Sequence, residues 1–152
     1  MSLHTHTRPS LDATMVAIAF AIAERSTCVR RKVGAVATDR FGRVLAIAHN
    51  GSPKGHPHCI DVPCLGAALA PGTGLDLCEA VHAEMNLLSF CPDIMRISTV
   101  YVTASPCITC IKSIANSSCS RIVFVEEYPH PQAQDFWLTI PERTWVQFVR
   151  PI

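Results

Sequence analysis

Two short stretches of this chain, His82-Ala83-Glu84 and Pro106-Cys107-Ile108-Thr109-Cys110, combine three metal-ligating side chains with one carboxylate. A catalytic zinc ion typically has three protein ligands and one open position, whereas a structural zinc ion has four ligands. Zinc held by three ligands lowers the pKa of its bound water, and a nearby carboxylate can move the released proton. We therefore expect a hydrolytic zinc centre with His82, Cys107 and Cys110 as ligands and Glu84 as the proton carrier.

The spacing of these residues agrees with this interpretation. Cys107 and Cys110 are three positions apart, so at the start of a helix they share one face. A helix N-terminus favours thiolates over thiols, and Pro106 suits the first turn. His82 and Glu84 are two positions apart and would not share a face of a regular helix, so we expect them in an opening turn.

Composition limits the class of protein. A chain of 152 residues with 49% hydrophobic content is expected to form one globular domain, spanning residues 1–152. With a net charge of +1, the chain lacks the excess of basic residues that polynucleotide-binding proteins have. A small substrate is therefore expected. Residues 1–9 do not resemble a signal peptide, and no apolar run is long enough to span a bilayer. These features predict no membrane association and a cytoplasmic location, in a bacterial cell or in a phage-infected host.

Hydrophobic periodicity predicts the elements that must position these residues. Four helices are expected at residues 11–25, 79–90, 107–116 and 132–138, and five strands at 33–38, 44–48, 99–103, 121–126 and 144–149. The first two strands should form an antiparallel hairpin. Strands that alternate with helices indicate a three-layer α/β domain.

The segment between the second strand and the second predicted helix is rich in glycine and proline. Long loops inside compact domains are usually functional, and this one needs something to hold it. Four cysteines lie before or within it: Cys28, Cys59, Cys64 and Cys78. Four thiolates would complete a structural zinc site. Buried free thiols are the alternative, and His49, His56 and His58 are competing ligands. Cys91 and Cys119 have no partner by spacing and are interpreted as structural.

The pattern H-x-E followed by P-C-x-x-C is typical of zinc-dependent nucleobase deaminases. From about residue 28 to residue 128 the chain resembles the deoxycytidylate deaminases, a branch of the cytidine deaminase superfamily. Ser105 precedes Pro106-Cys107, whereas tRNA adenosine, guanine and riboflavin-pathway deaminases have Glu at that position. The matching segments are RKVGAV (31–36), NGSPKG (50–55), VHAEMN (81–86), YVTASPCITC (101–110) and IVF (122–124).

The resemblance implies a cytidine deaminase-like α/β/α fold with a central mixed sheet of about five strands. It implies that Asn50 hydrogen-bonds the deoxyribose and that main-chain groups around Ala104 and Ser105 bind the base amino group. Activated water would attack C4 of cytosine while Glu84 protonates N3 and then the departing ammonia, converting dCMP to dUMP for thymidylate synthesis. Without the resemblance, Asn50 in an Asn-Gly pair is most simply a turn residue.

The resemblance also implies partners. Related enzymes are commonly homohexamers that dCTP with Mg²⁺ activates and dTTP inhibits, with effector sites formed partly by the loop that contains Gly51 and Lys54. Some relatives carry a second zinc with cysteines that match Cys28 and Cys59. The sequence itself has no glycine-rich phosphate loop of the Gly-x-x-x-x-Gly-Lys type.

Two alternatives stay open from the sequence. The chain could deaminate another free cytosine nucleoside or nucleotide, or it could be a zinc-stabilised nucleotide-binding module without catalytic activity. Glu84 argues against the second alternative, because a purely structural zinc site has no use for a free carboxylate. Editing of single-stranded nucleic acid has little support from two Trp, two Tyr and a near-neutral charge.

Overall fold

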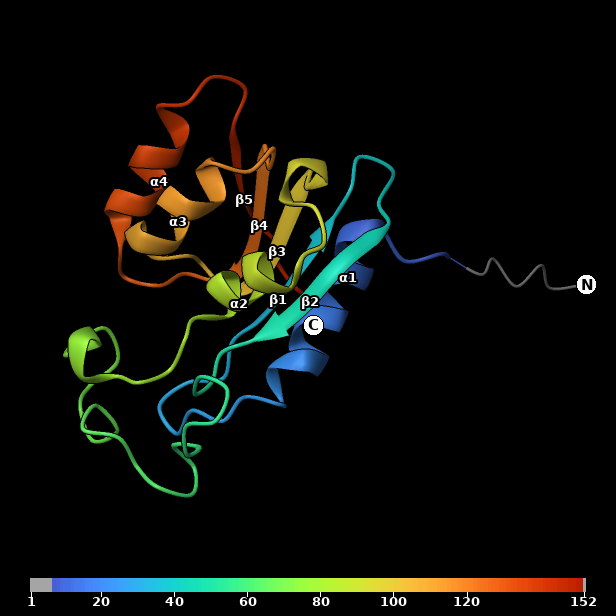
Figure 1. Cartoon of the computed structure of the whole chain (residues 1–152). Coiled ribbons are helices and arrows are strands. Elements are labelled where there is room, and N and C mark those ends of the chain that lie inside the picture. The colour runs from blue at the N-terminus through green and yellow to red at the C-terminus, as the bar shows by residue number, and fades with distance from the viewer. Residues whose placement is uncertain (1–6, 152) are drawn as a thin grey trace, which may run out of the picture.

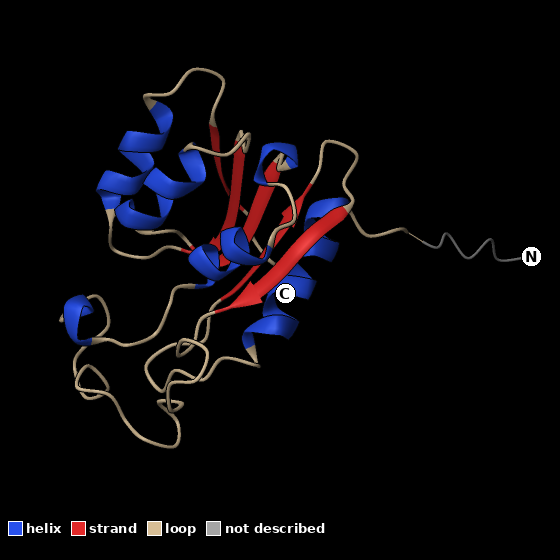
Figure 2. Ribbon diagram, viewed as in Figure 1, coloured by secondary structure: helices blue, strands red, loops and turns tan. Residues whose placement is uncertain are grey.

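The computed structural model describes residues 7–151 and is built around a mixed sheet with helices on both faces (Figure 1, Figure 2). The strand order is β2-β1-β3-β4-β5. β1 pairs antiparallel with β2 and β3, whereas β3–β4 and β4–β5 are parallel. The strands are β1 (Gly34–Thr38), β2 (Val44–His49), β3 (Thr99–Ala104), β4 (Arg121–Glu126) and β5 (Thr144–Gln147). The predicted mixed sheet of five strands and its first hairpin are confirmed.

Helices cover the two faces of the sheet unequally (Figure 1). α1 (Leu11–Ala23) packs on one face, and α2 (Ala83–Phe90), α3 (Ile108–Ala115) and α4 (Pro131–Leu138) pack on the other. Alternate strand residues point to opposite faces, so Tyr101 belongs to the α1 layer while its neighbours Val100 and Val102 belong to the other layer. The predicted three-layer α/β/α arrangement is therefore confirmed. Within the described chain, no helix has the length and apolar character needed to cross a membrane.

A polar network fixes α1 to the sheet. Ser10 is the N-cap of the helix, and its hydroxyl accepts a hydrogen bond from the Ala13 amide at 3.1 Å. Asp12 in the first turn accepts two hydrogen bonds from the Arg121 guanidinium, at 2.8 and 2.6 Å, and a third from the Tyr101 hydroxyl at 2.9 Å. Because Tyr101 lies on β3 and Arg121 on β4, one carboxylate joins the helix to two strands.

The start of α2 differs from the sequence prediction. The helix expected at 79–90 begins only at Ala83, so its predicted start was wrong. The cause is a tertiary contact: Val81 forms an isolated antiparallel bridge with Gly51, with N···O distances of 3.1 and 2.8 Å. A residue that pairs as a strand cannot also belong to a helix, and no local sequence pattern marks this pairing.

Smaller differences occur at the ends of other elements. α1 ends two residues before the predicted boundary, because the Arg25 and Ser26 amides bond to carbonyls three residues back and tighten the last turn. α3 spans Ile108–Ala115, with Cys107 as its N-cap, and α4 begins at Pro131. β5 ends at Gln147 rather than at residue 149, since its pairing with β4 stops there.

Residues 51–81, called here the cysteine loop, run outside the sheet and contain a single described 3₁₀ turn, Leu75–Leu77. In Figure 1 this segment, coloured from turquoise to green, lies beyond one end of the sheet. Hydrogen bonds tie it to the rest of the chain and to itself. They include the hydrogen bond from the Ile60 amide to the Thr27 carbonyl at 3.1 Å and the contact of His56 with Glu79 at 2.7 Å.

Candidate active site

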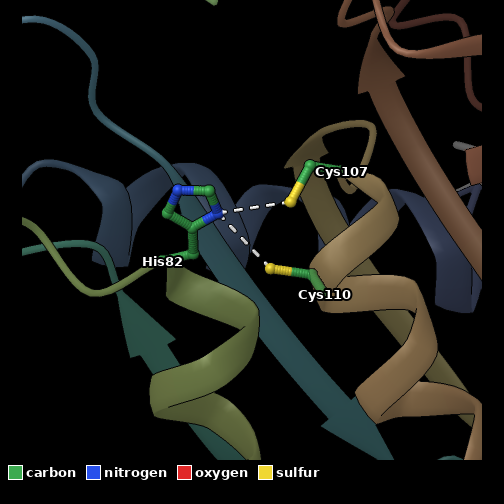
Figure 3. Close-up of side chains that lie close together, drawn as sticks. All are labelled: His82, Cys107 and Cys110. Atoms are coloured by element: carbon green, nitrogen blue, oxygen red, sulfur yellow. Dashed lines mark hydrogen bonds between the residues drawn. The ribbon is translucent and has the colours of Figure 1, made fainter. Parts of the chain in front are cut away.

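The three predicted zinc ligands meet between the first turns of two helices. His82 is the N-cap of α2, Cys107 is the N-cap of α3, and Cys110 lies in the first turn of α3. Their side chains point toward one another, with His82 Nδ1 3.6 Å from Cys107 Sγ and 3.4 Å from Cys110 Sγ (Figure 3). Tetrahedral zinc with bonds of about 2.3 Å to sulfur and about 2.0 Å to nitrogen requires N···S separations of about 3.5 Å. The donor set therefore fits a zinc ion.

Glu84 lies beside these ligands because α2 begins at Ala83. His82 has extended backbone angles, φ −64° and ψ 149°, and Glu84 follows in the first helical turn, so both lie in the opening turn that the sequence predicts. The Glu84 Oε2 atom is 3.8 Å from Cys110 Sγ, and the residue is only 4% exposed. A carboxylate is thus held against the ligand cluster, out of contact with bulk water.

Burial shapes the titration of this cluster. Desolvation raises the pKa of Glu84 above its ordinary value. The Cys107 thiolate accepts a hydrogen bond from the Cys110 thiol, which lowers the pKa of Cys107 to about 3 and raises the pKa of Cys110. The hydrogen bond to Cys107 raises the pKa of His82. The thiols and imidazole thus share protons that a metal cation would displace on binding.

A cavity opens next to the ligand cluster. His82, Glu84 and Cys107 form part of its wall. The three residues predicted to contact the substrate also line it: Asn50, Ala104 and Ser105. The remaining lining residues come from the segment that precedes β1, the cysteine loop, the start of α2 and the chain after β4.

The side chain of Asn50 shapes the backbone next to this cavity. Its Oδ1 accepts a hydrogen bond from the Val33 amide at 2.9 Å, and its Nδ2 donates to the Arg31 carbonyl at 2.8 Å. The residue is buried, with 7% exposure, and lines the cavity. Asn50 therefore fixes the course of the chain before β1. Its predicted contact with deoxyribose stays a prediction.

The two residues named as effector contacts lie outside the cavity wall. Gly51 is buried in the bridge to Val81, and a Cβ atom there would lie 2.6 Å from Thr27 Oγ1, so the close approach requires glycine. Lys54 is exposed at the start of the cysteine loop. Their part in binding an effector stays a prediction.

The four cysteines predicted to hold a second zinc ion are gathered only in part. Cys59 Sγ and Cys64 Sγ are 3.7 Å apart, while Cys28 and Cys78 line the cavity. Within residues 7–151, only the set of His82, Cys107 and Cys110 brings all its ligand atoms within 4.8 Å of one another. Burial raises the pKa of Cys78, and a backbone hydrogen bond from Glu79 lowers the pKa of Cys64.

The two cysteines interpreted as structural are buried away from these sites. Cys119 belongs to the apolar core with Cys91, and burial raises the pKa of Cys119 to about 11. A thiol in this environment stays protonated and packs as a small apolar side chain.

Sequence reasoning missed Tyr128 as a residue of the cavity. It follows β4, and the Arg31 guanidinium lies 4.6 Å from the centre of its ring. Ligands in α/β proteins bind at the carboxyl ends of parallel strands, and β3 and β4 are parallel. A parallel pair of strands is therefore the signal that indicates the residues just after Glu126 as cavity residues.

Comparisons with known proteins agree with this geometry. The family described as the cytidine and deoxycytidylate deaminase zinc-binding region matches residues 9–126. The deoxycytidylate deaminase of Mycobacterium phage D29 is 41% identical over 128 residues, which cover 79% of this chain and 98% of that protein. The deoxycytidylate deaminase of Schizosaccharomyces pombe is 33% identical over 125 residues, and the match covers 80% of this chain but only 38% of the yeast protein.

A solved structure shows the same architecture. The dCMP deaminase from the cyanophage S-TIM5, in complex with dCMP and dUMP, superposes with a TM-score of 0.71 at 25% sequence identity, covering 93% of this chain and 98% of the phage chain. The family match includes all three zinc-ligand candidates and Glu84. By sequence and by fold, this chain belongs to the cytidine and deoxycytidylate deaminase family.

Proposed function

We propose that this chain catalyses the hydrolytic deamination of dCMP to dUMP and ammonia, a step that supplies dUMP for thymidylate synthesis. The observation that carries the proposal is the convergence of His82, Cys107 and Cys110 with the buried carboxylate of Glu84 at one cavity. The relative from phage D29 is a deoxycytidylate deaminase, and the match with this chain covers 98% of that relative's length.

Glu84 is the proton carrier of the proposed reaction. Zinc, when bound, supplies a Lewis acid that makes water a nucleophile near neutral pH. Glu84 accepts a proton from this water and passes it to N3 of cytosine as the water oxygen adds to C4. It then takes the second proton, from the new hydroxyl on C4, and delivers it to the amino group, which departs as ammonia when its bond to C4 breaks. Its raised pKa favours the protonated form in which Glu84 carries a proton between these steps.

Ala104 and Ser105 are proposed to orient the base through the main chain. The Ser105 amide donates to the Glu126 carbonyl at 2.8 Å, and the Ser105 hydroxyl accepts a hydrogen bond from the Tyr128 amide at 2.7 Å. These partners fix the peptide groups at the end of β3. A carbonyl oxygen is then the group that can accept a hydrogen bond from the amino group of cytosine.

A substrate panel tests the function. Ammonia release from dCMP, dCTP and deoxycytidine is measured with zinc-loaded protein, and kcat/KM is expected to be highest for dCMP. A higher kcat/KM for another cytosine compound would identify a different free nucleoside or nucleotide as the substrate. Tight dCMP binding without ammonia release from any of the three would favour the nucleotide-binding module instead.

We also propose a second, structural zinc ion held by Cys28, Cys59, Cys64 and Cys78. The 3.7 Å separation of Cys59 Sγ and Cys64 Sγ supports it, because this distance suits two ligands of one zinc ion. The competing histidines have other partners: His49 contacts the Asn50 carbonyl, His56 contacts Glu79 and His58 lies near Asp61. Metal analysis of the purified protein tests the proposal, because one zinc per chain instead of two would contradict it.

Regulation and assembly are proposed from the family resemblance. We propose a homohexamer of this single deaminase domain, residues 1–152, in which dCTP with Mg²⁺ activates and dTTP inhibits. Velocity against dCMP concentration, with and without each effector, tests the regulation, and light scattering tests the assembly. Identical hyperbolic curves would mean an unregulated enzyme. The cytoplasmic location stays a prediction from the sequence.

A further inference from the structure

Two aromatic residues after β4, Tyr128 and His130, stack on each other, and they differ in their relation to the cavity. Their ring centres are 4.8 Å apart, with an angle of 49° between the ring planes. Tyr128 lines the cavity, whereas His130 is not among its lining residues. Tilted aromatic pairs at this separation attract each other beyond what the burial of their surface contributes. His130 therefore contacts the cavity wall through the ring of Tyr128.

The imidazole of His130 has no polar role in the described structure that would explain its position. Its Nε2 atom is buried and makes no hydrogen bond within residues 7–151. His130 is the N-cap of α4, yet its side chain does not cap the helix, in contrast to Ser10 at the start of α1. A buried polar atom without a partner costs free energy, so this nitrogen adds nothing to stability. The stacking on Tyr128 is the interaction through which the ring can act.

The backbone holds His130 firmly in place. The residue lies between Pro129 and Pro131, and a proline fixes its own φ angle and restricts the residue before it. The His130 amide donates to the Tyr128 carbonyl at 2.7 Å. The α4 helix that follows is anchored in the apolar core by Ala133 and Trp137, which are fully buried. His130 thus offers a fixed surface to the neighbouring ring.

The other neighbours of the Tyr128 ring are less firmly held. The Arg31 guanidinium, 4.6 Å from the ring centre, is itself positioned by an ion pair with Glu126, whose side chain is 60% exposed. Exposed ion pairs contribute little to stability. The Tyr128 hydroxyl faces Gly72 of the cysteine loop, where a Cβ atom would lie 3.5 Å away. His130, fixed by α4, is therefore the firmest support of the ring.

We propose that His130 is a positioning residue for the reaction: it holds the Tyr128 ring in the cavity wall by aromatic packing, without hydrogen bonding or proton transfer. This inference rests on the proposed function, because the reaction it serves is the deamination of dCMP at this cavity. When the stacked pair is lost, the fraction of molecules with the ring in place falls, and the apparent affinity for a ligand falls by the same factor. An aromatic pair accounts for a factor of about 2 to 12.

Three substitutions separate the ring of His130 from its nitrogens, and KM and kcat for dCMP are measured for each with zinc-loaded protein. His130→Ala removes both, and His130→Gln keeps a polar nitrogen without a ring. Both should raise KM about 2- to 12-fold and leave kcat within about twofold. His130→Phe keeps a ring without nitrogens, so its KM should stay within about twofold of wild type. Calorimetric dCMP affinities in the Glu84→Gln background should follow the same order.

Two controls test whether the effect passes through Tyr128. Gln132→Ala changes an exposed residue in the first turn of α4 and should leave KM within about twofold of wild type. In a Tyr128→Ala background, His130→Ala should change KM by less than about twofold, because the residue through which it acts is already gone. Zinc content is measured for every variant and should not change.

A spectroscopic readout does not depend on dCMP. The chain has only two tyrosines, so protein labelled with 3-fluorotyrosine gives fluorine NMR signals from Tyr101 and Tyr128 alone. Tyr101 is buried in the α1 layer and serves as the internal reference. Loss of the stacked ring in His130→Ala should shift the Tyr128 signal and leave the Tyr101 signal in place.

An unchanged KM of the active enzyme, or an unchanged Tyr128 signal, in His130→Ala would overturn the inference. Rescue by His130→Gln and not by His130→Phe would assign the role to a nitrogen and would also overturn it. An undiminished effect of His130→Ala in the Tyr128→Ala background would do the same. A wild type that releases no ammonia from dCMP, while the Tyr128 signal responds to His130→Ala and dCMP affinity follows the expected order, would refute the proposed function and leave the positioning role of His130 in place.

Discussion

The catalytic centre and the cysteine loop both offer cysteine and histidine side chains, yet they position them in different ways. The ligands of the centre lie on the first turns of α2 and α3, whose following residues Leu87, Ile111 and Ile114 are fully buried. The thiols of the loop lie on a segment with one 3₁₀ turn, and only Cys59 and Cys64 are in close contact. Helices packed on a sheet position the catalytic ligands before any metal binds, whereas the loop has little core of its own.

This difference predicts different consequences of mutation in the two regions. Segments with few buried apolar contacts open at low free-energy cost, so the cysteine loop should depend on a cross-linking metal. The centre should keep its geometry when its chemistry is removed, because the apolar core and not the metal holds α2 and α3.

The largest expected effect is at Glu84. Glu84→Gln removes the proton carrier and keeps the size of the side chain, so kcat should fall by about 10²- to 10⁴-fold. The zinc content and Tm should stay near those of wild type, because Glu84 is not among the three ligands. Steady-state ammonia release and metal analysis measure these quantities. Glu79→Gln, on the cysteine loop, is the control and should keep kcat within about threefold. Full activity of Glu84→Gln would show that another group carries the proton.

The next largest effect is expected for a mutation that weakens the cysteine loop while the catalytic centre stays active. Cys64→Ser should remove one of about two zinc ions per chain and make the loop sensitive to limited proteolysis, while ammonia release remains detectable. A cross-link that closes a loop is typically worth about 2–4 kcal/mol, so Tm should fall by about 5–15 °C. Cys91→Ala changes a buried thiol outside the loop and should keep both zinc ions. Unchanged zinc content in Cys64→Ser would remove this residue from the ligand set.

A smaller effect is expected on the opposite face of the sheet. Asp12→Asn keeps the shape of the side chain and removes the charge that Arg121 and Tyr101 bind, which should cost about 1–2 kcal/mol and lower Tm by about 2–8 °C. KM for dCMP should not change, because α1 contributes no residue to the cavity wall. Asp135→Asn, an exposed change on α4, serves as the control. A change in KM would show that α1 also positions the site.

The smallest effect is a pH dependence of that same network. Hydrogen bonding from Arg121 lowers the pKa of Asp12 below its unfolded value of about 3.9. The carboxylate therefore contributes stability above about pH 4, and this contribution is lost as the pH falls through the folded pKa. Urea unfolding of wild type and Asp12→Asn between pH 7 and pH 3 measures it: the difference in free energy of unfolding should shrink below about pH 4. A constant difference would mean that packing alone accounts for the effect.

Whether a sequence prediction is correct depends on how far apart in the chain the interacting residues lie. The predicted start of α1 at residue 11 is correct, and the N-cap bond there, from the Ala13 amide to the Ser10 hydroxyl, spans only three residues. The start of α2 was wrong because Val81 pairs with Gly51, thirty positions away along the chain. The Cys-x-x-Cys spacing brings two ligands together at the start of α3, because Cys107 is the N-cap and Cys110 lies in the first turn, only three positions later.

The types and local spacing of His82, Glu84, Cys107 and Cys110 are determined by the sequence itself, and they already indicate zinc-assisted hydrolysis. Only the tertiary structure brings the N-termini of α2 and α3 together at the carboxyl ends of β3 and β4. Only the tertiary structure also gives Arg31 the Glu126 carboxylate and the Tyr128 ring as partners. The physical reason is that burial and charge compensation depend on contacts between residues far apart in the chain, which periodicity and spacing do not encode.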